Sequence, residues 1–197
     1  MPEETPKKTQ EKGSLAGKLL LAMPSIADDR FERAVIFMCA HDDKGAMGLR
    51  VNHMMSEIGF DKVIAQTGIK SDIAIDLDDV DVLDGGPVEG ARGFLLHSGE
   101  FRQKDTILVS DDYGVSGTVD ALRNVVEGNG PGQMLFVLGH SGWSAGQLDR
   151  ELQQNTWLVA DATPDLIFNT PNDKKWEAAL ASMGIDVGML SATSGNA

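Results

Sequence analysis

Several features that would narrow the function at once are scarce in this sequence. One cysteine, Cys39, occurs among 197 residues, so no disulfide can form within the chain, and a reducing compartment is expected. The longest apolar runs, at residues 19–23 and 34–40, are far shorter than the roughly 20 residues of a membrane-spanning helix. The polar N-terminus also lacks the apolar centre of a secretory signal. We therefore expect a cytoplasmic chain that does not associate with a membrane.

Basic residues are outnumbered as well. The chain has 17 Lys and Arg against 30 Asp and Glu, which gives a formal net charge of −13. Proteins that bind nucleic acid cluster Lys and Arg against the phosphates, and no basic stripe of that kind occurs along this chain. We therefore expect no direct contact with nucleic acid. The partner is not identified by the sequence, but an acidic surface is suited to a basic protein.

The length and the 42% content of apolar residues fit one compact domain. We assign this domain to residues 15–190, with a disordered tail at 1–14 and a loose polar tail at 191–197. Within the domain, apolar runs typical of strands alternate with segments of helical periodicity. We predict helices at 57–66, 117–127 and 173–183 and another capped by Ser144, and strands at residues 18–23, 34–41, 46–52, 93–97, 107–110, 134–138 and 157–160.

The stretch HDDKGAMG, residues 41–48, mixes the residue types found in metal and phosphate sites. A phosphate loop leads from a strand into a helix N-terminus, but the residues that follow this stretch have strand character. Aspartates early and a glycine late are typical of a tight hairpin turn, because Gly45 tolerates positive φ. We therefore predict a hairpin. Gly48, inside its second strand, indicates a bulge or a close approach to the backbone.

Six aspartates and no basic residue lie between residues 71 and 84, which raises the question of a calcium site. A calcium loop of the EF-hand kind needs glycine at its sixth position and a bidentate glutamate at its twelfth. Counted from Asp76, those positions hold Asp81 and Pro87. We therefore predict a solvated acidic loop followed by a turn at residues 84–87, and no bound metal.

Ser141, within GHSGW, is placed like the nucleophile of a hydrolase, after a predicted strand and before a predicted helix. The motif G-x-S-x-G is incomplete, because Trp143 stands where the second glycine should be. The bulk of that side chain opposes the close packing of strand and helix that the sharp turn requires. We therefore interpret this stretch as a turn that leads into a helix.

Cys39 and His41 lie two apart on a predicted strand, so their side chains should share a face, and an imidazole-assisted thiolate is conceivable. Reactive thiols need an electropositive and partly exposed setting, whereas Cys39 lies within IFMCA. We therefore expect a buried thiol, with redox sensing as the alternative. The histidines at strand ends could converge with Cys39 on a metal, but their spacing matches no zinc pattern, so no metal or cofactor is predicted.

Several long motifs occur in a fixed order between residues 15 and 188, namely LLLAMPSI, DRFERAVIFMCAHDDKGAMGLRVN, GGPV, RGFLLH, LGHSGWSAGQLDREL, NTWLVA and KKWEAALASMGID. Together they resemble the YqgE/AlgH family of bacterial proteins. The resemblance implies a cytosolic α+β fold with a mixed, partly barrel-like sheet flanked by helices. The biochemical function of most members is unknown, and the AlgH name implies a link to gene regulation. The acidic charge makes such a link indirect.

Two hypotheses follow. The first is a non-enzymatic binding or regulatory protein, which the absence of a complete catalytic motif favours. The second is a small hydrolase or thiol enzyme that uses Ser141 or Cys39 with a histidine. For either function, we predict a cleft lined by the strand ends and the glycine turns, at Cys39, His41, Gly48, Asn52, Gly86, His97, His140 and Trp143.

Overall fold

The computed structural model describes residues 13–70 and 72–190 of the chain. The tails predicted at 1–14 and 191–197 lie outside the described residues, apart from Gly13 and Ser14. Among the helices in the described ranges, none is long and apolar enough to cross a membrane.

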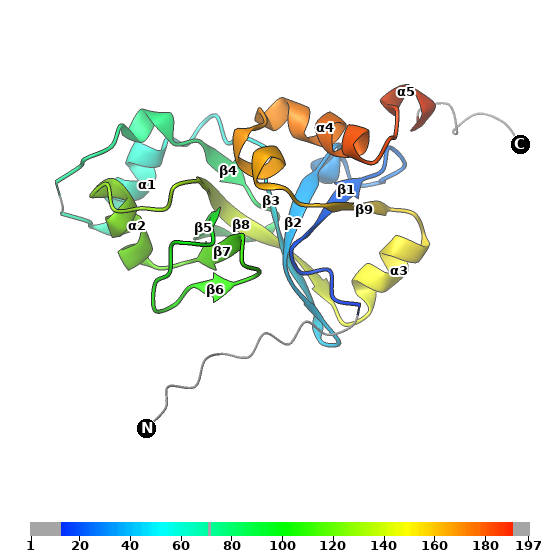
Figure 1. The fold of residues 1–197 in the computed structure, drawn as a ribbon, viewed down its shortest axis with the longest axis horizontal. Helices are drawn as coiled ribbons and strands as arrows, with labels where there is room; N and C mark the ends of the chain where they lie inside the picture. Colours follow the sequence, from blue (N-terminus) through cyan, green and yellow to red (C-terminus); the bar gives the residue numbers. More distant parts are fainter. Residues whose placement is uncertain (1–12, 71, 191–197) are drawn as a thin grey trace, which may run out of the picture.

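A curled sheet of nine strands forms the centre of the molecule (Figure 1). Its strands follow the order β6-β7-β5-β8-β3-β2-β1-β9, with antiparallel pairing, and β4 lies parallel to β8. The predicted mixed, partly barrel-like sheet of an α+β protein is therefore confirmed. The strands are β1 (Lys18–Ala22), β2 (Val35–Asp42), β3 (Gly45–Arg50), β4 (Val82–Asp84), β5 (Val88–Ser98), β6 (Ile107–Leu108), β7 (Tyr113–Ser116), β8 (Met134–Ser144) and β9 (Trp157–Asp161).

The helices cover different parts of this sheet. Helices α1 (Phe60–Thr67) and α2 (Val119–Val126) lie at the end formed by β5 and the first half of β8, where Phe60 packs against Phe136 (Figure 1). Helix α3 (Gln147–Gln153) packs on the opposite end, beside β9. A π-helix (Asp165–Asn169), α4 (Lys175–Ser182) and α5 (Val187–Leu190) follow, and the short 3-10 turns are Asp29–Phe31, Leu77–Asp79 and Asn172–Lys174.

The stretch HDDKGAMG forms the predicted hairpin between β2 and β3. Asp42 accepts a hydrogen bond from the backbone N–H of Lys44 at 2.8 Å, and Gly45 has a φ of +147°. A Cβ on Gly45 would lie 2.4 Å from the carbonyl oxygen of Trp143 on β8. Gly48 also admits a close neighbour, because a Cβ there would lie 2.5 Å from a methyl group of Ile36. Both glycines therefore serve strand packing.

The helix-entry turn predicted around Ser141 is wrong. Strand β8 continues through Ser144, and Ser141 pairs with Gly48 of β3 in the middle of the ladder. Helix α3 is preceded by Gly146, with a φ of +68°, rather than capped by the predicted Ser144. The first half of β8 is apolar and was predicted, whereas the second half extends only because β3 pairs with it.

The acidic segment is also more ordered than the predicted loop. Asp76 caps the turn Leu77–Asp79, and the residues Val82–Asp84 form β4 beside β8. Strand β7 was not predicted either, and β5 begins at Val88 rather than at the predicted residue 93. Short strands such as β4 and β7 carry too few residues for a recognisable alternation, so their pairing with long neighbours determines them.

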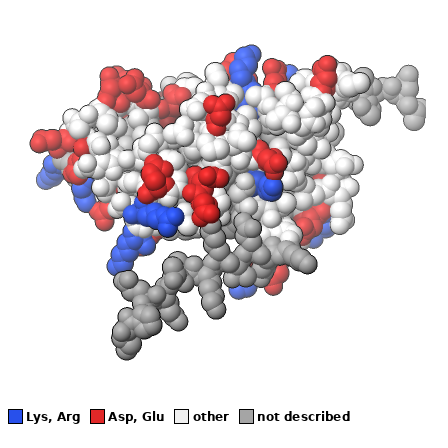
Figure 2. All heavy atoms as spheres, in the orientation of Figure 1, with Lys and Arg blue, Asp and Glu red and all other residues white. Residues whose placement is uncertain are grey.

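Acidic residues are spread over the molecular surface. Figure 2 shows carboxylate side chains distributed across one face, with basic side chains interspersed rather than gathered into a stripe. This distribution agrees with the formal net charge of −13. The visible face therefore offers no extended basic track of the kind that follows a nucleic-acid backbone.

Candidate functional site

Cys39 and His41 do not form the pair that their spacing suggested. A bulge in β2 leaves Cys39 as the extra residue between Met38 and Ala40, so the prediction of a shared face is wrong. Cys39 packs in the core, and burial raises the pKa of its thiol to about 12. His41 lies on the opposite face, where its Nε2 is 3.9 Å from Asp149 of α3. No imidazole therefore assists this thiol.

Ser141 and His140 are not hydrogen-bonded to each other either. The Ser141 hydroxyl is buried and donates to the carbonyl oxygen of Gly85 at 3.2 Å. The His140 Nδ1 has no hydrogen-bond partner and lies 3.7 Å from Glu89, while the imidazole ring packs edge-on against Phe94. The serine that the sequence singled out is thus bonded to the backbone and is not activated by its neighbour.

The remaining predicted cleft residues have structural partners. Asn52 accepts the N–H of Val35 at 2.9 Å and donates to the carbonyl of Arg33. Gly86 packs tightly against β8, since a Cβ there would lie 2.4 Å from the Ser141 hydroxyl. The indole N–H of Trp143 donates to Glu151 at 2.8 Å. Within the described residues, no group of three or more His, Cys, Asp and Glu side chains could hold a metal ion.

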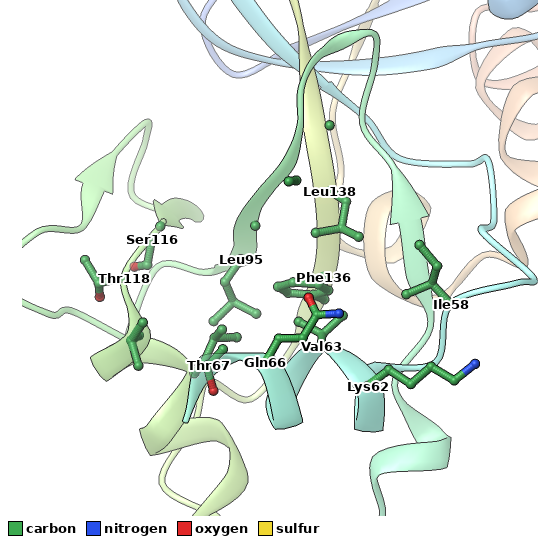
Figure 3. Close-up of a pocket in the computed structure, with 16 residues that line it drawn as sticks. Ile58, Lys62, Val63, Gln66, Thr67, Leu95, Ser116, Thr118, Phe136 and Leu138 are labelled. Atoms are coloured by element: carbon green, nitrogen blue, oxygen red, sulfur yellow. The ribbon is translucent and has the colours of Figure 1, made fainter. Parts of the chain in front are cut away.

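A cavity of about 610 Å³ lies elsewhere, between α1, α2 and the face of the sheet formed by β5 and β8 (Figure 3). Leu95 and Phe136 form its floor, and Val63 and Gln66 reach toward them from α1. Its walls are mostly apolar, with a few polar side chains. The full lining comprises Ile58, Lys62, Val63, Gln66, Thr67, Gly90, Ala91, Gly93, Leu95, Ser116, Gly117, Thr118, Val119, Leu122, Phe136 and Leu138.

Glycines in β5 keep this cavity open. The register of β5 with β8 shifts between Val88 and Gly93, so the intervening residues bulge from the ladder. A Cβ on Gly93 would lie 2.9 Å from the ring of Phe136, whereas a Cβ on Gly90 would meet nothing within 4 Å. Gly93 therefore permits the close packing of the floor, and Gly90 borders open space.

Ser116, which lines the cavity, meets a buried histidine behind the cavity wall. Ser116 on β7 lies opposite Leu95 on β5, and His97 follows Leu95 two residues later, so all three side chains share the face of the sheet that the cavity covers. His97 is fully buried, and Ser116 is 2% exposed. The Oγ of Ser116 lies 2.9 Å from the Nε2 of His97. This pair was missed because β7 was not predicted.

The hydrogen bonds determine where the protons lie. The Nδ1 of His97 is 2.9 Å from the carbonyl oxygen of Ser98, which only accepts, so Nδ1 carries the proton. The Nε2 therefore accepts from the Ser116 hydroxyl. Thr106 in turn donates to the Ser116 oxygen at 2.8 Å and accepts the N–H of Gln103. Burial lowers the pKa of His97, which keeps the imidazole neutral.

Comparisons with a family model and with known proteins agree on one family. The model of the AlgH-like family matches residues 19–188. A UPF0301 protein from Rhizorhabdus wittichii is 47% identical over 184 residues, which cover 93% of this chain and 97% of that protein. A UPF0301 protein from Ruegeria pomeroyi is 46% identical over 184 residues, covering 93% of this chain and 99% of the relative.

Two solved structures resemble this one. The solution structure of the AlgH protein from Pseudomonas aeruginosa has a TM-score of 0.78 and 32% identity, and the match covers 100% of both chains. The crystal structure of a Corynebacterium diphtheriae protein has a TM-score of 0.70 and 19% identity, covers 89% of this chain and 90% of that one, and shows a likeness of fold alone. The family match and the relatives agree with the resemblance of the sequence motifs, and the chain belongs to the AlgH-like family.

Proposed function

We propose that this protein binds a small, uncharged and largely apolar molecule in the cavity between α1, α2 and the sheet. The cavity itself carries the proposal, because its volume of about 610 Å³ falls among the pockets of roughly 300–1,000 Å³ that enclose small ligands. The partly exposed side chains of Ile58, Val63 and Leu138 provide apolar surface from which a ligand would displace water. Binding is the main function of the site in this proposal.

The polar groups of the lining support an uncharged ligand. Thr67, Ser116 and Thr118 offer hydroxyl groups, whereas Lys62 is the single charged residue among those that line the cavity. The Lys62 side chain extends away from the centre of the cavity (Figure 3). A protein with a net charge of −13 also repels anions as they approach. Uncharged esters, ketones and alcohols with short alkyl chains fit this combination.

In this proposal the protein acts in the cytoplasm, and any effect on gene expression is indirect. The resemblance of the motifs to the YqgE/AlgH family implies a link to gene regulation. The support for an indirect route is electrostatic, because the excess of Asp and Glu over Lys and Arg opposes contact with phosphates. A protein partner would then respond to the state of the cavity.

The test measures binding of the neutral dye Nile red and its displacement by 2-octanone, an uncharged ketone that cannot be hydrolysed. Gly90→Leu places a side chain where the structure leaves open space at the cavity, so it should weaken both affinities at least tenfold. Ala181→Leu is the matched control, because Ala181 is exposed on α4 and does not line the cavity. Urea unfolding should show both variants within about 0.5 kcal/mol of the wild type.

The proposal is supported if 2-octanone displaces the dye from the wild type and from Ala181→Leu with equal affinity and from Gly90→Leu only weakly. Thermal unfolding should agree, since a ligand that binds only the folded state raises the unfolding temperature. Equal displacement from all three proteins would place the ligand elsewhere and overturn the proposal. Absence of displacement from the wild type would overturn it as well.

A further inference from the structure

We propose that Ser116 is a nucleophile and His97 its general base, and that together they transfer the acyl group of a small uncharged ester bound in the cavity. The inference rests on the proposed function, because the ester must enter the same cavity. It also goes beyond binding, since it assigns a reaction to residues that the motif GHSGW does not contain. The incomplete motif had favoured a non-enzymatic protein.

The protons of the Ser116–His97 pair lie on the atoms on which nucleophilic catalysis requires them. A serine is activated when its hydroxyl donates to an unprotonated imidazole nitrogen within about 2.6–3.2 Å, and when a third group orients the base. The Ser116 hydroxyl and the Nε2 of His97 are 2.9 Å apart, and the carbonyl of Ser98 fixes the Nδ1 proton at 2.9 Å. Thr106 holds the serine oxygen from the other side. The fold therefore positions the hydroxyl group, its base and the group that orients the base.

The surroundings hold the imidazole in place. His97 packs edge-on against Phe101, with ring centroids 5.1 Å apart. A Cβ on Gly114 would lie 2.5 Å from the Cε1 of His97, so only glycine leaves room for the ring beside β7. Ser116 is nearly closed to bulk solvent but contributes to the cavity wall. In this proposal the bound ester approaches the Ser116 hydroxyl group from the cavity.

The chain after Ser116 resembles the turn on which hydrolases carry their nucleophile. Strand β7 ends at Ser116, Gly117 and Thr118 follow, and α2 begins at Val119. The first N–H groups of a helix have no partners within it, and the helix dipole favours negative charge at that end. Gly117, Thr118 and Val119 line the cavity. The oxyanion of a tetrahedral intermediate would form near these donors.

The reaction balances with water as the second substrate. The Ser116 oxygen forms a bond to the ester carbonyl carbon while its proton moves to the Nε2 of His97, and the carbonyl π electrons move onto oxygen. The intermediate then collapses, the bond to the alkoxy oxygen breaks, and the leaving alcohol takes the proton from Nε2. Water, deprotonated by Nε2, attacks the acyl-serine in the same way and releases the acid. The sum is ester plus water to acid plus alcohol.

The experiment incubates the full-length protein with p-nitrophenyl butyrate and measures the release of p-nitrophenolate in the first turnover. Digestion and mass spectrometry then locate the butyryl group. Ser116→Ala should abolish the adduct, and His97→Gln should slow its formation at least about 100-fold, the usual contribution of a general base. Ser141→Ala is the matched control and should acylate like the wild type, because the Ser141 hydroxyl bonds to the backbone of Gly85 and not to this pair.

The pH profile separates a catalytic imidazole from a structural one. Acylation should be level through neutral pH and should fall on acidification below the pKa of His97, which burial lowers from its usual 6.5. Circular dichroism would show whether the variants fold. If they do not, a fluorophosphonate on the wild-type protein still identifies the modified serine, because it needs no substitution.

The outcomes distinguish this inference from the proposed function. A butyryl or phosphonyl group on Ser116, lost in Ser116→Ala that still binds 2-octanone, supports both. Binding of 2-octanone by the wild type without modification of Ser116, or with modification at another residue, overturns the inference and leaves the binding proposal standing. Absence of both binding and modification overturns the two together.

Discussion

Lys175 illustrates how single buried polar residues hold this fold. Lys175 is 1% exposed, and its ammonium group donates to the carbonyl of Val51 at 2.8 Å and to the side chain of Asn172 at 2.9 Å. Neither acceptor carries a formal charge, so burial dominates and lowers the pKa of Lys175 to about 8, although Asp81 opposes the shift. The lysine ties α4 to the end of β3 at an electrostatic cost.

This cost predicts a pH dependence. Between pH 8 and 10.5 the unfolded chain holds the Lys175 proton more often than the folded chain does, so the stability contributed by this residue rises with pH. The free energy of unfolding of the wild type, relative to Lys175→Met, should therefore increase by on the order of 2 kcal/mol from pH 7.5 to pH 10. Lys174→Met, which removes an exposed lysine at the neighbouring position, is the matched control. Urea unfolding at several pH values measures the difference, and a constant difference would contradict the prediction.

The residue scale also explains why Cys39 and His41 do not share a face. Cys39 and His41 were placed on one face by a period of two, but a single bulge reverses the side-chain direction. Such a bulge depends on how β2 packs against β3, so the residues between Val35 and Asp42 do not reveal it. His97 was among the predicted cleft residues, whereas its hydrogen-bond partner Ser116 was not.

At the scale of elements, α3 is fastened to the sheet by one carboxylate. One oxygen of Glu151 accepts the indole N–H of Trp143 at 2.8 Å and that of Trp157 at 2.7 Å. The other oxygen accepts from Gln147, one turn earlier on the helix. Strands β8 and β9 are thereby joined to α3 through a single side chain.

Glu151→Leu should therefore cost on the order of 2–4 kcal/mol, because it leaves two largely buried indole N–H groups without acceptors. Glu151→Gln keeps an oxygen for the indoles and loses the bond from Gln147, so about 1 kcal/mol is expected. Urea denaturation compares the two free energies. Equal losses for both variants would mean that the indole bonds do not stabilise the docking of α3.

Elements with their own hydrophobic pattern were predictable, and those without one were not. Apolar runs mark the strands β1, β2 and β9. Helical periodicity marks α1 and α2, together with capping residues such as Gly68 and Thr118. Strand β4 has three residues and β7 has four, too few for a period to appear. Strand β4 forms because it pairs with β8, and β7 forms because it pairs with β5.

At the scale of the whole molecule, the net charge of −13 predicts how the protein behaves toward nucleic acid. Non-specific binding to DNA comes from the release of counterions by clustered basic residues, and the visible face in Figure 2 shows basic side chains mixed with acidic ones and no extended basic track. The fluorescence anisotropy of a labelled duplex should stay unchanged at about 10 µM protein in about 0.15 M salt. Salt-dependent binding at that concentration would contradict the prediction and reveal a basic surface elsewhere.

The sequence by itself determined the composition of the core, the acidic charge, the tight β2–β3 hairpin and the family. These follow from local periodicity, turn chemistry and counts of residues, all of which are properties of neighbouring positions. Only the tertiary structure decided that the cavity opens between α1 and α2 and that Ser116 meets His97, 19 residues away along the chain. The physical reason is that strand pairing and helix docking bring distant residues together, and no short stretch of sequence records which partner each will find.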